Sequence, residues 1–509
     1  MNYADLFRVT LPETALEIAA LIVLVVDLGF LRKAALQVRV ASAAILGILG
    51  CAAAVFTLPF QPYYGLSASN GDLLLSVGGY STVAQIGILG LTVLTLFLFI
   101  GSEFTKHAGE FVAVVLMAAA GGLLISSAQD LLVIFVGLEL LSLGLYILAA
   151  FAKKSGKSAE GAIKYYLFGG MSAAFLLFGF SYLYGLSGST NLHRIMMATY
   201  GSHAVNASPL LYVALVMIAA GLGFKVAAAP FHLWAPDAYE GSPAPSAAFI
   251  ASVSKVASFA LLIGIATASA NVFGQVEAVH TLAAYTNQAQ PTYIGFQSPW
   301  SVVVTLIATA SMVLGNLAAL AQVSVRRLLA YSAIAHAGYI LLALAYFSQS
   351  AMSANAVMYY ILTYGLTTIG AFGAVAIVER ATGSDRMDAF LGLNQRNPVL
   401  ASELLVLFLS LAGIPPLVGF WAKFNLFAAV LKTGSGVVPF ALVALALAMS
   451  AVSLYYYLQV LKRVYVMPAV DKTPIRASHV TMIVLQLITA TVVVLGCFPE
   501  LLQRWIEGF

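Results

Sequence analysis

The chain has 509 residues, of which 61% are hydrophobic and only 9% are charged, and its formal net charge is +4. Soluble domains carry about 25% charged residues, so this composition excludes a soluble protein and indicates a polytopic membrane protein. The apolar runs are about 20 residues long or longer, which suits helices that cross about 30 Å of hydrocarbon, whereas a membrane β-barrel would alternate apolar and polar residues.

Residues that could hold a metal or a cofactor are sparse. The two cysteines, Cys51 and Cys497, lie far apart in apolar runs and form no CxxC or Cys/His cluster, so we expect two small buried apolar side chains and no iron–sulfur, zinc or disulfide site. The sequence contains no glycine-rich nucleotide loop after a strand and no nucleophile–base pair. We therefore expect no cofactor and no metal on this chain. We also expect no cleaved signal peptide, because the start MNYADLFRVTLPET lacks a basic segment followed directly by an apolar core.

The apolar runs predict an all-α polytopic membrane protein with about fourteen transmembrane helices. In chain order, the expected spans are 11–31, 40–59, 81–101, 108–127, 130–151, 162–186, 208–229, 243–270, 299–320, 326–347, 354–379, 400–430, 437–463 and 478–502. No soluble domain fits between them. The longest connections, near 60–80, 187–207 and 271–298, are polar but carry few charges.

Positive charge is distributed unevenly over the predicted loops. Seventeen of the 24 lysines and arginines fall in odd-numbered loops, whereas four fall in even-numbered loops or at the termini. Short cytoplasmic loops of membrane proteins are enriched in these residues. We therefore expect the odd-numbered loops to face the cytoplasm and both termini to lie on the opposite side. The segment with Asp237 and Glu240 is an exception, because it is acidic on the predicted cytoplasmic side.

Four charged residues lie deep inside predicted spans: Glu139 in the fifth, Lys225 in the seventh, Lys255 in the eighth and Lys423 in the twelfth. A lysine at the bilayer centre costs about 3 kcal/mol, so such residues usually serve an ion or proton path. The alternatives are that Glu139 forms a hydrogen bond that only supports packing, and that Lys225 extends its ammonium group to the membrane surface. The second is poorly supported, because Lys225 lies far from either end of its span.

Glycine and proline interrupt the seventh and the twelfth predicted helices. The interrupting residues are Gly221, Gly223 and Pro230 in the seventh, and Gly413, Pro415, Pro416 and Gly419 in the twelfth. The two breaks lie five helices apart, and five is odd, so the two units would enter the membrane in opposite directions. Paired interrupted helices in an inverted repeat point to a transport site.

This pattern predicts four parts of the chain. They are 1–127 with helices 1–4, 108–270 with helices 4–8 as a first repeat, 299–463 with helices 9–13 as a second repeat, and 478–509 with helix 14.

Two histidines add to the buried ionisable groups. His336 lies near the middle of the tenth span beside Tyr331 and Tyr339, and His232 follows the break in the seventh. Either could carry protons, and either could instead be a hydrogen-bonded histidine with a structural role. The series Glu139, Lys225, Lys255, His336 and Lys423 suits proton movement, because burial and neighbouring charges together decide whether a buried lysine keeps its proton. From the residues, the chain is a proton or cation translocator whose energy source stays open.

Four stretches carry a resemblance to a known family: EGAIKYYLFGGMSAAFLLFGFSYLYGLSG, FHLWAPDAYEGSPAPSAAFIASVSK, RRLLAYSAIAHAGY and LAGIPPLVGFWAKF. They resemble subunit N, an antiporter-like membrane subunit of the proton-pumping NADH–quinone oxidoreductase, respiratory complex I. The resemblance implies one proton channel, in which Glu139, Lys225, Lys255 and Lys423 match the charged residues of the family and Lys255 is the bridging lysine. The buried residues themselves add His336 to this relay and His232 as possible proton access. Lys423 argues against the M-type relatives, which typically carry glutamate there.

The resemblance also implies partners and a location. Electrons would pass from NADH through flavin and iron–sulfur clusters to quinone in other subunits, so this chain would hold none of these cofactors. Its neighbours would be M-type and small K-type subunits in a bacterial inner membrane. The main alternative is a subunit of a multisubunit cation/proton antiporter, which shares the same core. A membrane scaffold with vestigial charges, and photosynthetic or hydrogenase-linked relatives with another electron donor, remain further alternatives.

Overall fold

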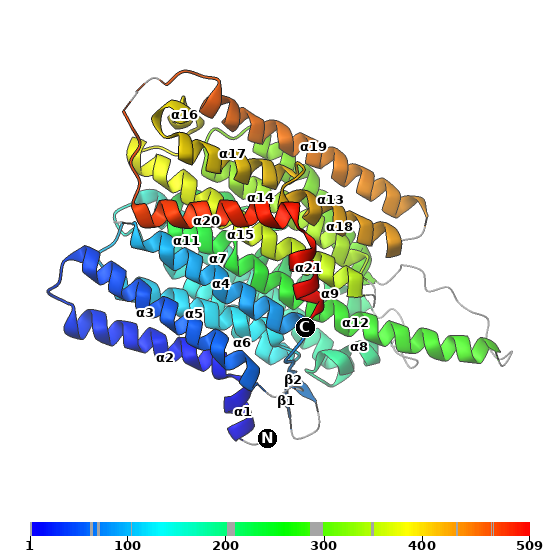
Figure 1. Ribbon diagram of the computed structural model, residues 1–509. Helices are drawn as coiled ribbons and strands as arrows, with labels where there is room; N and C mark the ends of the chain where they lie inside the picture. The colour runs from blue at the N-terminus through cyan, green and yellow to red at the C-terminus, as the bar shows by residue number, and fades with distance from the viewer. Residues whose placement is uncertain are drawn as a thin grey trace.

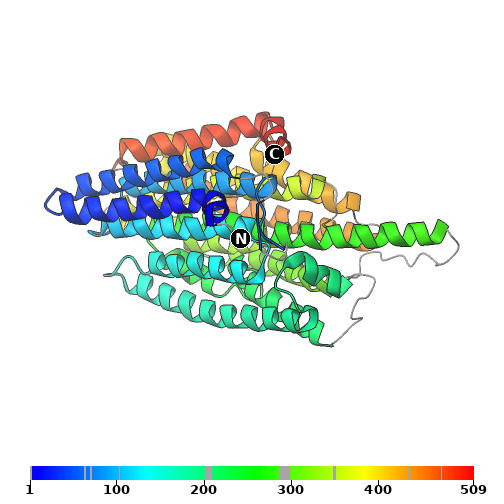
Figure 2. The ribbon, with the colours of Figure 1, turned by 90° about the horizontal axis from the view of Figure 1, so that it is seen from below.

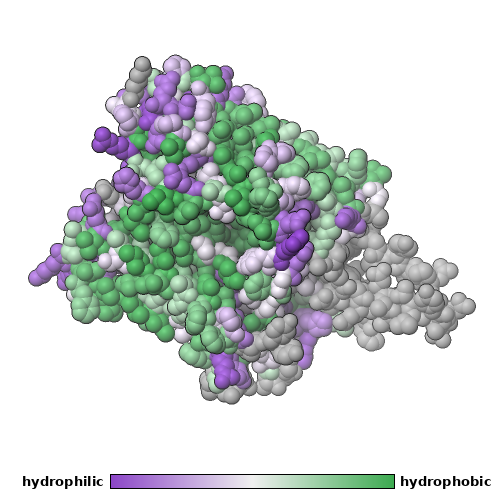
Figure 3. Space-filling model, viewed as in Figure 1, coloured by the Kyte–Doolittle hydropathy of each residue, from purple (hydrophilic) through white to green (hydrophobic). Residues whose placement is uncertain are grey.

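The computed structural model describes residues 3–61, 65–68, 72–102, 104–200, 209–285, 299–347, 351–433, 436–469, 471 and 473–509. Its helices pack side by side in one bundle (Figure 1), and both termini lie near the short strands β1 and β2 at one end of it. Hydrophilic residues gather at the two ends of this bundle, and hydrophobic residues cover the helices between them (Figure 3). Eleven described helices are long and apolar enough to cross a membrane, which confirms an integral membrane protein of helical class.

The elements follow the expected order. Those of the first half are α1 (Tyr3–Val9), α2 (Leu11–Val25), the π-helix η1 (Val26–Phe30), α3 (Leu36–Thr57), η2 (Leu58–Phe60), β1 (Leu66–Ser67), β2 (Leu73–Leu75), α4 (Tyr80–Ile100), α5 (Ala108–Ser127), α6 (Leu131–Ala149), α7 (Gly156–Ser187), α8 (Leu192–Tyr200), α9 (Pro209–Lys225), α10 (Trp234–Gly241), α11 (Ala244–Ala251) and α12 (Val253–Tyr285). Those of the second half are α13 (Pro299–Leu320), α14 (Val325–Ala345), α15 (Ala351–Thr382), η3 (Met387–Phe390), α16 (Leu393–Arg396), α17 (Pro398–Ala412), α18 (Val418–Thr433), α19 (Val437–Tyr465), α20 (His479–Cys497) and α21 (Glu500–Glu507).

Several boundaries differ from the expected spans for local reasons. The predicted span 162–186 was too short, because Ser155 caps α7 by accepting a hydrogen bond from Ser158 N and the helix begins at Gly156. The single helix expected over 478–502 is wrong, because Pro499 disfavours helical backbone at the preceding residue and α20 ends at Cys497. Cys497 is exposed at that end, not buried as expected, whereas Cys51 is buried.

The connections also contain more regular structure than expected. A two-stranded antiparallel sheet of β1 and β2 occupies part of 60–80, and α8 occupies part of 187–207. The first part of the connection expected over 271–298 is helical, because α12 continues to Tyr285. As a result, α12 extends beyond the other helices at the end of the bundle where the termini lie (Figures 1 and 2). The eleven long helices and two shorter apolar ones, α9 and α17, leave the predicted total of fourteen spans unconfirmed.

Close helix approach at α13 and α14 depends on small residues on both sides. A Cβ atom at Gly315 would lie 2.6 Å from Ala335 N, and one at Gly338 would lie 2.7 Å from Met312 N. Small residues let membrane helices approach closely, and in lipid this packing replaces the hydrophobic driving force that acts in water. The two glycines therefore hold α14, which carries His336, directly against α13.

Candidate functional site

The predicted break in the seventh helix separates α9 from α10, and it lies inside protein. Backbone groups freed from a helix in a membrane must find other partners. Three hydrogen bonds supply them here: from Ser172 Oγ to the Gly221 carbonyl (3.0 Å), from Trp234 Nε1 to the Phe224 carbonyl (3.0 Å), and from Ala229 N to Ser311 Oγ (2.8 Å). Side chains of α7, α10 and α13 therefore stabilise the break that follows Lys225.

Lys225 is the last residue of α9 and is 7% exposed. Its ammonium group donates a hydrogen bond to the hydroxyl of Ser142 on α6, and it lies 5.9 Å from the centre of the Tyr146 ring. Glu139, one turn before Ser142 on α6, is half-buried and close enough to Lys225 to interact with it electrostatically. Among the described residues no ion pair joins Glu139 to Lys225. Ser142, which accepts from Lys225, donates its own hydrogen bond to the carbonyl of Leu138 on the same helix.

Lys255 and His336 lie together in the middle of the bundle, and they are 3% and 4% exposed. Lys255 Nζ donates a 2.6 Å hydrogen bond to the carbonyl of Ala333, which precedes His336 by one turn of α14. The ring of Tyr364 on α15 lies 5.7 Å from Lys255 Nζ and 4.9 Å from the His336 ring. His336 Nδ1 is hydrogen-bonded to the hydroxyl of Tyr360 at 2.7 Å.

Lys423 follows the second break and is 6% exposed. Its Nζ donates hydrogen bonds of 2.8 Å to the carbonyl of Ala412 and to Ser450 Oγ. Ala412 is the last residue of α17, and carbonyls at a helix C-terminus carry partial negative charge that favours a cation. Gly413 has φ 89°, and a Cβ atom there would lie 2.9 Å from the Lys423 side chain. Gly413 therefore both ends α17 and leaves space for the lysine.

Lys423 and His336 share a second tyrosine. The centre of the Tyr339 ring lies 5.5 Å from Lys423 Nζ and 5.8 Å from the His336 ring. Buried Asn316 donates to the Tyr339 hydroxyl (3.0 Å), and its own carbonyl oxygen accepts from Tyr456 (3.2 Å). The structure thus assembles Lys255, His336 and Lys423 around tyrosines that the sequence analysis did not assign to the relay.

The predicted residues form two separate groups. The first contains Glu139 and Lys225, and the second contains Lys255, His336 and Lys423. No hydrogen bond or ring contact among the described residues joins Lys225 directly to Lys255. His232 belongs to neither group: it is half-buried, its ring centre lies 6.4 Å from that of Tyr331, and its Nδ1 has no partner within the described ranges.

The acidic exception to the charge pattern is explained by ion pairs at the end of the bundle opposite the termini. Asp237 on α10 pairs with Lys164 (2.8 Å) and Arg327 (2.6 Å), and Glu240 pairs with Lys157 (2.8 Å) and Arg327 (3.0 Å). Burial by itself would raise the pKa of Asp237, but the hydrogen bonds from Lys164 and Arg327 outweigh it and hold the pKa below its ordinary value. Both carboxylates are therefore charged at neutral pH and tie α10 to α7 and α14.

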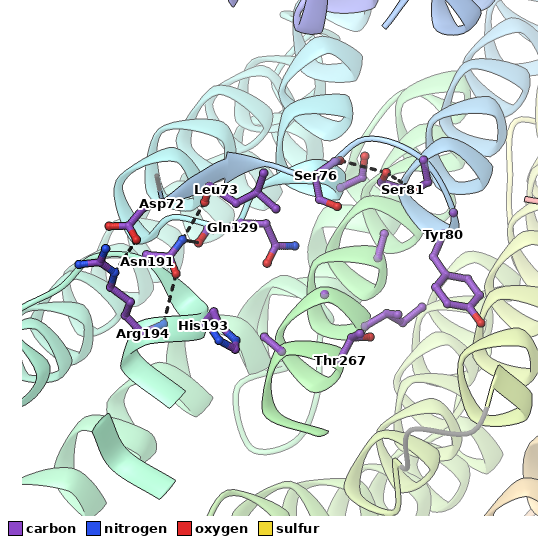
Figure 4. Close-up of a pocket in the computed structure, with 17 residues that line it drawn as sticks. Asp72, Leu73, Ser76, Tyr80, Ser81, Gln129, Asn191, His193, Arg194 and Thr267 are labelled. Carbon is purple, nitrogen blue, oxygen red and sulfur yellow. Dashed lines mark hydrogen bonds and ion pairs between the residues drawn. The ribbon is translucent and has the colours of Figure 1, made fainter. Parts of the chain in front are cut away.

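A cavity of about 520 Å³ is lined in part by Leu73 of β2 (Figure 4), and both termini lie near this strand (Figure 1). Asp72 and Arg194 form an ion pair at 2.5 Å beside it, and Gln129 lies at its wall. Along α12 the lining residues are Ala260, Ile263, Gly264, Thr267 and Ala268. At about 100° per residue, all of these residues except Ile263 lie more than about 90° around α12 from Lys255. The cavity is therefore not part of the group around Lys255.

Comparisons with known proteins agree on one family. The chain matches the family described as "NADH:quinone oxidoreductase/Mrp antiporter, TM" over residues 128–286 and 276–450. It is 46% identical to NADH-quinone oxidoreductase subunit N 2 of Acidobacterium capsulatum, over 100% of this chain and 99% of that protein. A chain of respiratory complex I from Thermus thermophilus is 33% identical, with TM-score 0.75 and coverage of 97% of this chain and 98% of that one. A chain of the Mrp complex from Dietzia is 20% identical with TM-score 0.75, covers 97% and 96% of the two chains, and shows a shared fold.

Proposed function

Because the chain belongs to the NADH:quinone oxidoreductase/Mrp antiporter transmembrane family, we propose that it is the proton-translocating subunit N of a complex I. In this function, electron transfer from NADH to quinone in other subunits drives protons through this chain. The observation that carries the proposal is the set of lysines at two broken helices and between them, each at least nine-tenths buried and none in an ion pair within the described part of the chain. Such amines can gain and lose protons as neighbouring charges change.

Each residue has a distinct part in the proposed relay. Lys225 takes up a proton beside Glu139, and His232 lies at the break through which water could reach it. Lys255 carries the proton between the two groups, and His336 passes it on toward Lys423. This order is supported by the shared contacts of Lys255 and His336 with Tyr364, and of His336 and Lys423 with Tyr339. The path from Lys225 to Lys255 would need water or side-chain movement, because no contact among the described residues joins them.

Flavin and iron–sulfur clusters belong to partner subunits in this proposal, with M-type and small K-type subunits as membrane neighbours. The alternative, a cation/proton antiporter, is supported by the likeness to the Mrp chain, but at 20% identity that likeness extends to the fold alone. A full-length relative at 46% identity favours subunit N.

The experiment that tests this function is purification of the complex through an affinity tag on this chain. We expect flavin, iron–sulfur clusters and NADH-driven quinone reduction in the same preparation, because the proposed driving reaction occurs in partner subunits. A preparation that exchanges cations for protons but contains no NADH-oxidising subunit would instead support the antiporter.

We also propose the two repeats, 108–270 and 299–463, and the orientation that the loop charges predict, with the termini outside the cytoplasm of a bacterial inner membrane. The orientation can be tested at Thr267, which lines the cavity at the terminus end. In a Cys497→Ser background, which removes the exposed native thiol, Thr267→Cys should react with a membrane-impermeant reagent in right-side-out vesicles, whereas Leu261→Cys, whose position is 1% exposed, should not react. Labelling of Thr267→Cys only in inverted vesicles would reverse the proposed orientation.

A further inference from the structure

The two ring nitrogens of His336 have different surroundings. Nδ1 is hydrogen-bonded to the Tyr360 hydroxyl at 2.7 Å, whereas Nε2 is buried and has no partner within the described residues. Buried polar atoms almost always have a partner, often an ordered water. An unpartnered ring nitrogen in a closed polar site is therefore the atom that is free to bind water or exchange a proton.

The charges around the ring favour one arrangement of its protons. Lys255 on α12 and Lys423 on α18 both act on His336 electrostatically, and the aromatic rings around it belong to Tyr339, Tyr360 and Tyr364. Ammonium groups only donate hydrogen bonds. Both ammonium groups disfavour additional positive charge on the ring, and an N–H group buried without a partner is rarer in proteins than an unpartnered acceptor. The Nε2 lone pair should therefore be free, with the proton of the neutral ring on Nδ1.

We propose that Tyr360 is a positioning residue that sets the tautomer of His336. The Tyr360 oxygen accepts the hydrogen bond from Nδ1–H, which leaves Nε2 as the single ring atom that exchanges protons. One proton then moves from the Lys255 ammonium to Nε2, giving a neutral amine and an imidazolium, and next from Nε2 to the neutral amine of Lys423. The total charge is unchanged in each step. This inference rests on the proposed relay function.

Tyr360→Phe tests the inference, because it keeps the ring and removes only the hydroxyl. Loss of one hydrogen bond to a group that becomes charged should lower NADH-driven proton pumping by about ten- to a hundredfold. The matched control is Tyr359→Phe, since this neighbouring ring is 1% exposed and its hydroxyl has no partner among the described residues. Tyr359→Phe should pump at the wild-type rate.

Two further measurements separate positioning from a general structural role. In a double-mutant cycle, Tyr360→Phe should add nothing to the defect of His336→Ala, because the hydroxyl acts through the ring. In infrared spectra of isotope-labelled histidine, the band lost in His336→Ala should report an Nδ1–H tautomer, and Tyr360→Phe should shift it toward the Nε2–H form.

The possible results test the positioning role of Tyr360 separately from the proposed relay function of His336. Wild-type pumping in His336→Ala would overturn the role of His336 in the relay itself. A strong defect in His336→Ala, with an unchanged rate and an unchanged tautomer band in Tyr360→Phe, would overturn only the positioning role of Tyr360. Additive defects in the double variant would do the same.

Discussion

Replacing Lys225 by alanine is expected to reduce proton pumping and quinone-coupled turnover by about 100-fold, because removal of a proton-transfer group typically costs two to four orders of magnitude. The complex should still assemble, since Lys225 contacts Ser142 and aromatic rings but forms no ion pair in the described part of the chain. NADH-driven quinone reduction and proton uptake in reconstituted vesicles measure the effect.

Lys225→Arg distinguishes proton transfer from charge alone. Arginine keeps the positive charge but does not release its proton in proteins, so this variant should be nearly as defective as Lys225→Ala. Glu139→Gln should also be impaired, because the carboxylate that acts on Lys225 is lost. Lys432→Ala is the matched control, since Lys432 is exposed at the end of α18 and should leave pumping unchanged. Wild-type pumping in Lys225→Ala would overturn the assignment.

Lys255→Met is expected to interrupt transfer between the two groups of buried residues. Methionine keeps an unbranched side chain of similar size, so packing against α14 should persist, while the donor to the Ala333 carbonyl and the exchangeable proton are lost. Turnover and protons pumped per electron should both fall by at least about tenfold. Turnover and protons pumped per electron should be measured on the same preparation, because a proton leak through the membrane would lower only the number of protons pumped per electron.

The same variant allows a test of whether the residues act in series. If Lys255 and Lys423 lie on one path, the double variant Lys255→Met/Lys423→Met should be no more defective than the worse single variant. Unchanged turnover and unchanged pumping per electron in Lys255→Met would remove its bridging role. Independent, multiplying defects would indicate two separate paths through the chain.

The buried lysines and the helix breaks of the site could be predicted from the sequence. Placing a lysine in the hydrocarbon of a membrane has a high free-energy cost, so lysines inside apolar runs stand out in the sequence. Lys225, Lys255 and Lys423 were recognised in this way, and all three are buried as expected. The breaks were equally recognisable, because glycine and proline act through their own backbone chemistry. Proline also accounts for an error: Pro499 ends α20 early, although the apolar run continues to Leu502.

The hydroxyl groups of the site were not recognised. Ser142, Tyr360 and Tyr364 have ordinary neighbours in the sequence, and serine and tyrosine are common in membrane helices. Ser142 could have been suspected from its position one turn after Glu139, on the same face of α6. No comparable signal marks Tyr364, because its role depends on Lys255 and His336, which belong to two other helices.

The sequence by itself therefore determined that the chain spans a membrane, where its seventh and twelfth helices break, and which lysines are buried. These properties follow from the hydration cost of single residues and from local backbone chemistry. Only the tertiary structure decided that the predicted relay residues form two groups, that Lys225 donates to Ser142, and that the acidic α10 is neutralised by Lys157, Lys164 and Arg327. Hydrogen bonds and ion pairs act over a few ångströms, so they depend on which faces of distant helices meet, and no local pattern in the sequence records that.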